Sequence, residues 1–182
     1  GLKVEASQRG LSGVLSRQAL SLGEDHQQVV LVTAPHYNAT RGLLRRYERR
    51  AGDDTWGEVG EPIEVMLGAK GLARGRGLHD AMEGDPLRQQ EHKKEGDLRA
   101  PSGVFTFGTA FGKKTRAPYT TRGGAAWPYR SVDGEDQFVD DPASEHYNSW
   151  QRGGSDKSWS SAESLSMYEL GVVVEHNMRP VK

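Results

Sequence analysis

The stretch that decides the fold is Val29-Val30-Leu31-Val32-Thr33, a continuous apolar run in which four of five side chains branch at Cβ. β-branched side chains favour strands, and a short apolar run bounded by a turn signal is typical of a buried strand. Pro35 follows closely, and proline has no N–H to donate to a neighbouring strand. The run therefore predicts a strand over residues 29–34.

Four further runs have apolar alternation or β-branched content, and we expect strands over residues 43–49, 62–67, 103–108 and 171–175. Polar turn residues such as Gly52-Asp53-Asp54 separate them. The stretches between are rich in Gly, Arg, Lys and Glu and predict long loops, with at most a short helix over residues 83–94. These features together predict one mainly antiparallel β domain.

Composition limits the classes of function. The chain has 182 residues, the size of one domain, and 24 Lys and Arg balance 25 Asp and Glu. This balance excludes a globally basic nucleic-acid binder. No apolar run approaches the ~20 residues that cross a bilayer, so no transmembrane segment is predicted. Because the chain has no Cys, it cannot itself supply a disulfide, a cysteine ligand for zinc or a cysteine nucleophile.

The first 28 residues differ from the rest. Their apolar side chains recur at roughly helical spacing, at Leu11, Val14, Leu15, Ala19 and Leu22. We expect an N-terminal arm or short amphipathic helix over residues 1–28, followed by the β domain over residues 29–182.

Three motifs that often carry chemistry are incomplete here. The run Gly71–Gly77 lacks the Gly-Lys-Ser/Thr ending of a phosphate loop and predicts a turn-rich loop. The basic cluster Arg45–Arg50 would alternate between the two faces of a strand, which indicates a solvated sheet edge and no nucleic-acid partner. The histidines, at 26, 36, 79, 92, 146 and 176, lack metal-ligand spacing, so we expect neither metal nor cofactor.

His176 and Asn177 follow the last predicted strand, where an imidazole can enter a cleft. The alternative is a hydrogen-bonded residue that closes the strand. Asp140–Ser144 is typical of a turn, since the residue before a proline is disfavoured in the helical region of the backbone. Tyr147-Asn148, just beyond this turn, would ordinarily be loop surface.

Six segments of the sequence, taken in their order along the chain, indicate a protein family more specifically than any one segment does. In chain order they are Gln28–Ala34, Arg45–Arg49, Pro62–Gly68, Glu95–Asp97 leading to Pro101–Phe105, Asp140–Ser144 with Tyr147-Asn148, and Gly171–Asn177. This ordered set covers residues 28–178 and resembles the L,D-transpeptidase catalytic-domain family, YkuD type.

The resemblance implies a mainly β, antiparallel two-sheet sandwich with short peripheral helices and long loops. It also implies acyl transfer between peptidoglycan stem peptides, in which a cysteine thiolate attacks the donor carbonyl. The polar members of the matching segments predict the substrate cleft: Asp97, Tyr147, Asn148, His176 and Asn177. They would shape the cleft, and no residue of this chain is assigned a catalytic role.

The family's signature, a His-bearing strand followed by Ser/Thr-x-Gly-Cys, would lie downstream of His176 and has no match in this sequence. We therefore expect a C-terminally incomplete domain that lacks its last strands and is inactive as given. Completed by a catalytic segment, it would act on stem peptides in the cell envelope, in the periplasm or outside the cell.

Two alternatives stand beside this expectation. In the first, the chain is a non-catalytic accessory subunit, a pseudoenzyme whose exposed C-terminal sheet edge is covered by a protein partner. In the second, it is an Arg-rich interaction protein of a large ribonucleoprotein or membrane assembly, for example in an organelle.

Overall fold

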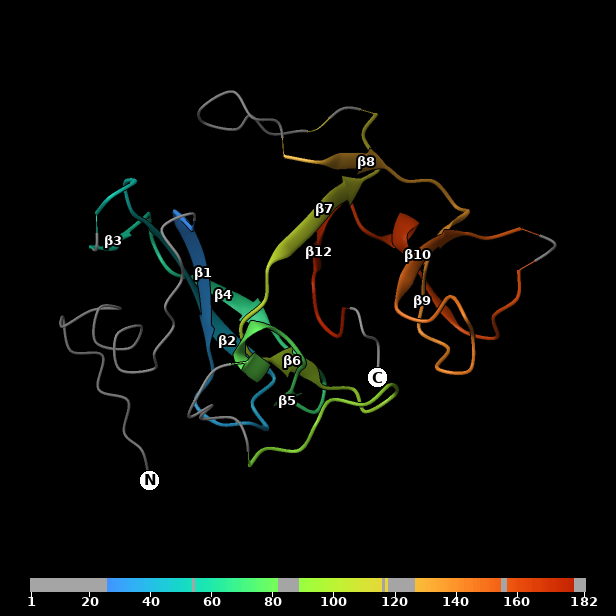
Figure 1. Ribbon diagram of the computed structural model, residues 1–182, viewed down its shortest axis with the longest axis horizontal. Coiled ribbons are helices and arrows are strands. Elements are labelled where there is room, and N and C mark those ends of the chain that lie inside the picture. The colour runs from blue at the N-terminus through green and yellow to red at the C-terminus, as the bar shows by residue number, and fades with distance from the viewer. Residues whose placement is uncertain are drawn as a thin grey trace. The chain divides into compact units, whose positions relative to one another are not determined.

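The computed structural model describes residues 26–53, 55–81, 89–115, 117, 127–154 and 157–178 (Figure 1). Its elements are short strands and two single 3-10 turns, η1 (Leu78–Ala81) and η2 (Leu165–Met167), so the predicted mainly β class is confirmed. The chain forms two compact units. Unit 1 comprises residues 1–74, 79–93 and 97–102, and unit 2 comprises residues 75–78, 94–96 and 103–182.

The main sheet of unit 1 is antiparallel and contains β1 (Gln28–Thr33), β2 (Arg41–Glu48), β3 (Gly57–Glu58) and β4 (Ile63–Met66). β2 is central, with β1 on one side and β3 and β4 on the other. The strands predicted over residues 29–34, 43–49 and 62–67 are therefore confirmed. Of the predicted arm over residues 1–28, residues 1–25 lie outside the described residues.

One face of this sheet carries a small core around Tyr47, which is 8% exposed and packs against Val29, Leu31 and Trp56. Val29 lies directly opposite Tyr47 in the β1–β2 register. Because β2 is paired on both sides, the interpretation of residues 45–50 as a sheet edge is wrong. Arg45 is instead held by Glu58 on β3, with 3.3 Å between Nε and Oε1.

A second, parallel pair in unit 1 joins β5 (Leu72–Arg74) to β6 (Ala100–Ser102). On the other side of β5, Arg74 N–H donates to the Glu91 carbonyl and Lys93 N–H donates to the Arg74 carbonyl, both at 2.8 Å. Two predictions are corrected by this arrangement. The run over residues 71–77 contains a strand, and residues 91–93 of the predicted helix instead lie along β5, where His92 forms a parallel bridge with Arg74. Residues 82–88 lie outside the described chain.

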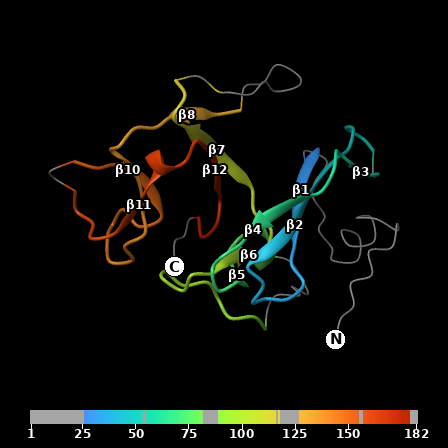
Figure 2. The ribbon, with the colours of Figure 1, turned by 180° about the vertical axis from the view of Figure 1, so that it is seen from behind.

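Unit 2 contains two three-stranded sheets. In the first, β7 (Phe107–Gly112) lies between antiparallel β12 (Leu170–Val174) and parallel β8 (Tyr129–Ser131). In the second, β9 (Asp136–Val139) lies between β10 (Ser149–Arg152) and β11 (Ala162–Ser164), both antiparallel to it. Figure 2 shows β10 and β11 from behind.

The two sheets of unit 2 pack on each other. Phe111 on β7, Val132 and Leu165 are buried, and Phe138, Trp150 and Val173 pack against them. The Phe111 and Trp150 rings meet edge to face with centroids 5.4 Å apart, a preferred aromatic geometry. The result is a small, mostly antiparallel two-sheet sandwich.

Two of the predicted strands lie in unit 2. The strand over residues 171–175 is confirmed as β12, whereas the strand over residues 103–108 begins only at Phe107. Residues 104–106 make backbone hydrogen bonds outside the named strands. The Val104 carbonyl accepts from Leu78 N–H, and the Thr106 carbonyl accepts from Glu175 N–H.

Candidate functional site

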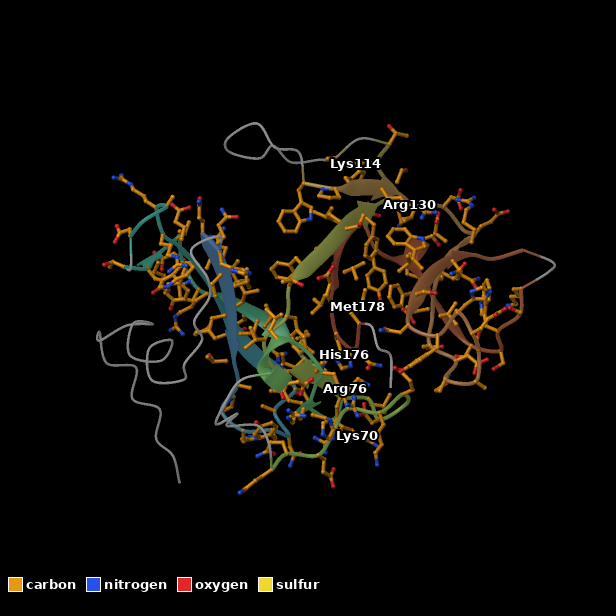
Figure 3. All side chains as sticks on the ribbon, in the orientation of Figure 1. Lys70, Arg76, Lys114, Arg130, His176 and Met178 are labelled. Carbon is orange, nitrogen blue, oxygen red and sulfur yellow. The ribbon has the colours of Figure 1, made fainter. Side chains whose placement is uncertain are left out.

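The residues that follow β12 form a tight, hydrogen-bonded corner in unit 2. Asn177 N–H donates to the Arg76 carbonyl at 2.9 Å, and Arg76 N–H donates to Nδ1 of His176 at 3.1 Å. Figure 3 shows Arg76 and His176 as neighbours. The His176 ring also meets Phe105 edge to face, with centroids 5.8 Å apart. Because Nδ1 accepts a backbone hydrogen bond, the neutral ring in this geometry carries its proton on Nε2.

Asn148 ties a second loop to this corner. Its Nδ2 donates to the His176 carbonyl at 3.1 Å and to the Asn177 carbonyl at 2.8 Å. Asn148 has φ 56° and Asn177 has φ 54°, so both lie in the left-handed region. Asparagine tolerates this region better than most residues, but such strained positions persist only where contacts hold them, and they concentrate at functional sites.

Tyr147 completes the group. Its hydroxyl donates to Glu95 Oε1 at 2.8 Å and accepts a hydrogen bond from the Asn177 side chain. Burial, followed by the Glu95 hydrogen bond and charge, raises the pKa of Tyr147 to about 12. We call Tyr147, Asn148, His176, Asn177 and Glu95 the asparagine cluster.

Four of the five residues predicted for the cleft are thus brought together. The fifth, Asp97, lies in unit 1, where its Oδ1 accepts from Lys93 Nζ at 2.8 Å and from Arg99 N–H at 2.9 Å. Sequence reasoning missed Glu95 and Arg76. Glu95 had a signal, since it belongs to the same Glu95–Asp97 segment, whereas Arg76 contributes only backbone groups to the described contacts with this corner.

His176 fits both interpretations of the sequence in part. Its ring and backbone are hydrogen-bonded at the end of a strand, as the simpler alternative expects. It also lies within a cluster of polar side chains from two loops, as a site would require.

The raised pKa of Tyr147 predicts a titration that a variant can isolate. A phenol with a pKa above its usual 10 favours the folded state below pH 10, and that contribution is lost as the pH rises from 10 to about 12. In the phenolate absorbance of the whole chain we expect a component near pH 12 that Tyr147→Phe removes. The comparison with wild type is needed because the pKa values of Tyr47 and Tyr168 are also raised. An unchanged titration in Tyr147→Phe would contradict this environment.

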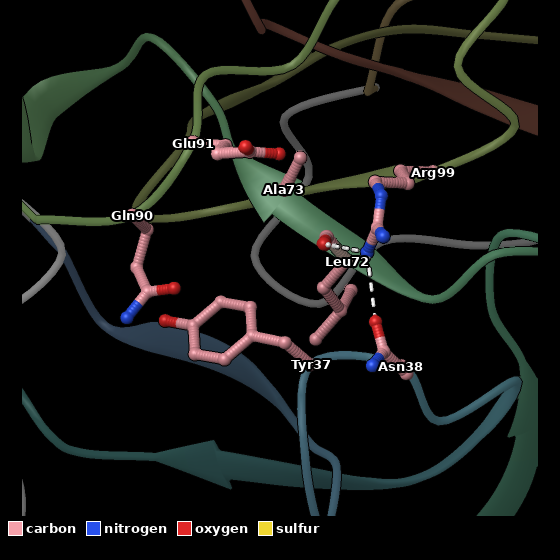
Figure 4. A pocket seen from close by; sticks show the side chains of 7 residues that line it. All are labelled: Tyr37, Asn38, Leu72, Ala73, Gln90, Glu91 and Arg99. Atoms are coloured by element: carbon pink, nitrogen blue, oxygen red, sulfur yellow. Dashed lines mark hydrogen bonds between the residues drawn. The ribbon is translucent and has the colours of Figure 1, made fainter.

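A second feature, in unit 1, is a pocket of about 190 Å³ (Figure 4). Its lining combines charged, amide and apolar groups: Tyr37, Asn38, Leu72, Ala73, Gln90, Glu91 and Arg99. Arg99 Nη1 donates to the Leu72 carbonyl at 2.9 Å and to Asn38 Oδ1 at 3.2 Å.

Among the described residues no group of three His, Asp or Glu side chains is placed to hold a metal ion. In the described residues no helix is long and apolar enough to span a membrane. Comparisons with protein-family models, curated proteins and solved structures find no match to this chain.

Proposed function

We propose that this chain supplies the scaffold and one wall of the substrate cleft of an L,D-transpeptidase-type domain, which transfers acyl groups between peptidoglycan stem peptides in the cell envelope. The observation that carries the proposal is the asparagine cluster. Asn148 and His176 are 28 positions apart in the sequence and come from two separate segments of the ordered set that resembles the family. Their direct contact supports a shared role for those segments.

The chemistry of the cluster suits a peptide. A stem peptide presents amide donors, amide acceptors and carboxylates along an extended backbone. The cluster offers a carboxylate on Glu95, the amide oxygen of Asn148 and the imidazole of His176. Its backbone is held in place by Asn148 and Arg76, and preorganised polar groups bind without a further ordering cost.

The nucleophile must come from outside these residues. Acyl transfer of this type needs a thiolate, and the sequence contains no Cys. β12 is an edge strand of its sheet, and Leu170, Val172 and Val174 on one of its faces are 52%, 40% and 41% exposed. An exposed apolar edge of this kind can accept a further strand that carries the cysteine.

Acyl transfer can be assayed directly. We expect no cross-linked product when the 182-residue chain is incubated with a tetrapeptide donor and a stem-peptide acceptor, because it has no thiolate. Addition of a C-terminal segment with the family's Cys signature should give product detectable by mass spectrometry, and the same segment with Cys replaced by Ser should not. Turnover by the chain alone would show that the nucleophile assignment is wrong. Absence of product with a Cys segment whose thiol is demonstrably reactive would argue against the proposal.

A second candidate is a non-catalytic accessory subunit, in the envelope or in an organelle assembly, with a partner protein on the β12 edge. The absence of Cys together with the exposed edge favours it. The intact mass of the native protein separates the two candidates. A mass well above 20.0 kDa with a Cys-containing extension favours the enzyme, and a mass equal to it favours the subunit.

A further inference from the structure

The main sheet of unit 1 has one covered face and one open face. On the covered face Tyr47 is 8% exposed, and Trp56 packs against it. The open face carries the side chains that alternate with these along the same strands. Val32 lies opposite Leu44, and Leu44 lies opposite Ile63, so these three side chains form one row across β1, β2 and β4.

The open face is apolar over all three strands. Val30, Val32 and Ile63 are 40%, 43% and 48% exposed. A Cβ on Gly42 would lie 3.3 Å from Leu67 Cδ1 and 3.3 Å from Val32 Cγ1, which places Leu67 on this face too. The apolar side chains of the open face are Val30, Val32, Leu44, Ile63, Val65 and Leu67. A contiguous exposed patch of this kind indicates an interaction surface.

The dimensions of the open face suit one helix. β1 and β4 lie on opposite sides of β2, about 10 Å apart at ~4.8 Å for each strand spacing. Val30 is opposite Arg46 and Val65 is opposite Gly42, so the apolar rows extend over four residues of β2, about 14 Å. A helix of twelve residues is about 18 Å long and ~10–12 Å wide.

The segment that precedes β1 has the complementary pattern. Residues 1–25 lie outside the described residues, and their sequence contains an apolar stripe: Leu11, Val14, Leu15, Ala19 and Leu22. At about 100° per residue, these five side chains fall within an arc of about 140° on a helix. Leu20 falls on the opposite side.

The connection to β1 limits where this segment can lie. Arg49 N–H donates to the Gln27 carbonyl and Arg49 Nε donates to the His26 carbonyl, both at 2.9 Å, so the chain enters β1 at a fixed place beside β2. Between Leu22 and β1 there are only residues 23–27, and connections of about 2–6 residues are typical between a helix and the next strand of a layered fold. The covered face already holds Trp56, which leaves the open face for residues 11–22.

We propose that residues 11–22 bind the open face as an amphipathic helix, with Leu15 directed at the row of Val32, Leu44 and Ile63. The partner of this surface is then the chain's own N-terminal segment. The inference does not rest on the proposed function, because residues 1–74 belong to unit 1 and the asparagine cluster belongs to unit 2.

Ile63 provides the test, because it is the only isoleucine in the sequence and its δ1 methyl gives a single NMR signal. In the full chain with labelled isoleucine, leucine and valine methyls, we expect nuclear Overhauser contacts between Ile63 and Leu15. A sample that mixes labelled and unlabelled chains shows whether the contact forms within one chain. Absence of any contact from Ile63 to residues 11–22, or a contact formed only between two chains, would overturn the proposal.

Leu15→Asn and Leu20→Asn form a matched pair, since the same change is made on the stripe and opposite to it. Burial of one leucine shifts a docking equilibrium at least about tenfold, so Leu15→Asn should release the segment. Relaxation of the Ile63 methyl by a soluble gadolinium chelate should then rise severalfold, whereas Leu20→Asn should match wild type. The Tyr47 amide signal, from the covered side of the sheet, should stay unchanged in both variants if the sheet is folded. An Ile63 methyl that responds equally to both substitutions, or to neither, would contradict the proposal.

Discussion

Asp136→Ala is expected to lower the free energy of unfolding by about 3 kcal/mol, the low end for breaking a buried ion pair. Asp136 on β9 is 0% exposed. Its carboxylate accepts hydrogen bonds from Arg130 Nη2 at 2.9 Å, Arg152 Nη1 at 3.1 Å, Trp150 Nε1 at 2.9 Å and Asp133 N–H at 3.0 Å. The low end applies because the two arginine side chains are nearly half exposed and can be solvated again.

The effect extends beyond the ion pairs because Trp150 links the carboxylate to the core. The same indole that donates to Asp136 packs edge to face on Phe111 and lies under the Arg130 guanidinium, 4.5 Å from its Cζ. Without the carboxylate, the partly buried indole N–H of Trp150 loses its acceptor, which destabilises the fold more than the loss of a surface hydrogen bond. Both sheets of unit 2 should therefore loosen together.

Urea unfolding followed by tryptophan fluorescence and circular dichroism measures this change. Glu135→Gln is the matched control, because Glu135 also pairs with Arg152 but its side chain is 64% exposed. An exposed pair contributes at most about 1 kcal/mol, so the control should stay close to wild type. An Asp136→Ala variant as stable as Glu135→Gln would show that the buried carboxylate does not organise unit 2.

The strands predicted from the sequence are those whose own residues are β-branched or alternate between apolar and polar. β1, β4 and β12 are valine- or isoleucine-bearing runs, and their pattern alone indicates extended structure. β9 to β11 were missed. They are three or four residues long and polar, and the contacts that hold them join positions far apart, such as Asp136 with Arg152 and Trp150 with Phe111. No local periodicity reports such contacts.

The candidate site residues were predicted from the family resemblance, and this prediction is less complete than that of the strands. The segments that resemble the family contain the four predicted members of the asparagine cluster. Residue type alone could not show which side chain of Glu95–Asp97 joins the cluster. Glu95 contacts Tyr147, whereas Asp97, two positions later, bonds within unit 1. The left-handed backbone at Asn148 and Asn177 was equally invisible, because it is set by the hydrogen bonds that Asn148 makes across 28 and 29 positions.

We propose that the asparagine cluster binds a stem peptide, and Asn148→Gly tests this proposal. Glycine adopts φ 56° without strain, so the variant keeps the backbone path and removes only the amide that holds the His176 and Asn177 carbonyls. Loss of this preorganisation should weaken binding at least about tenfold. Asn38→Gly, the same change in unit 1, is the matched control and should bind the peptide as wild type does.

The most direct measurement is an NMR titration of the full chain and both variants with a peptidoglycan tetrapeptide. We expect saturable shifts at Glu95, Tyr147, Asn148 and His176 in wild type and Asn38→Gly, and shifts that fail to saturate over the same range in Asn148→Gly. Binding that leaves these amides unmoved, or that is equally tight in Asn148→Gly, would contradict it.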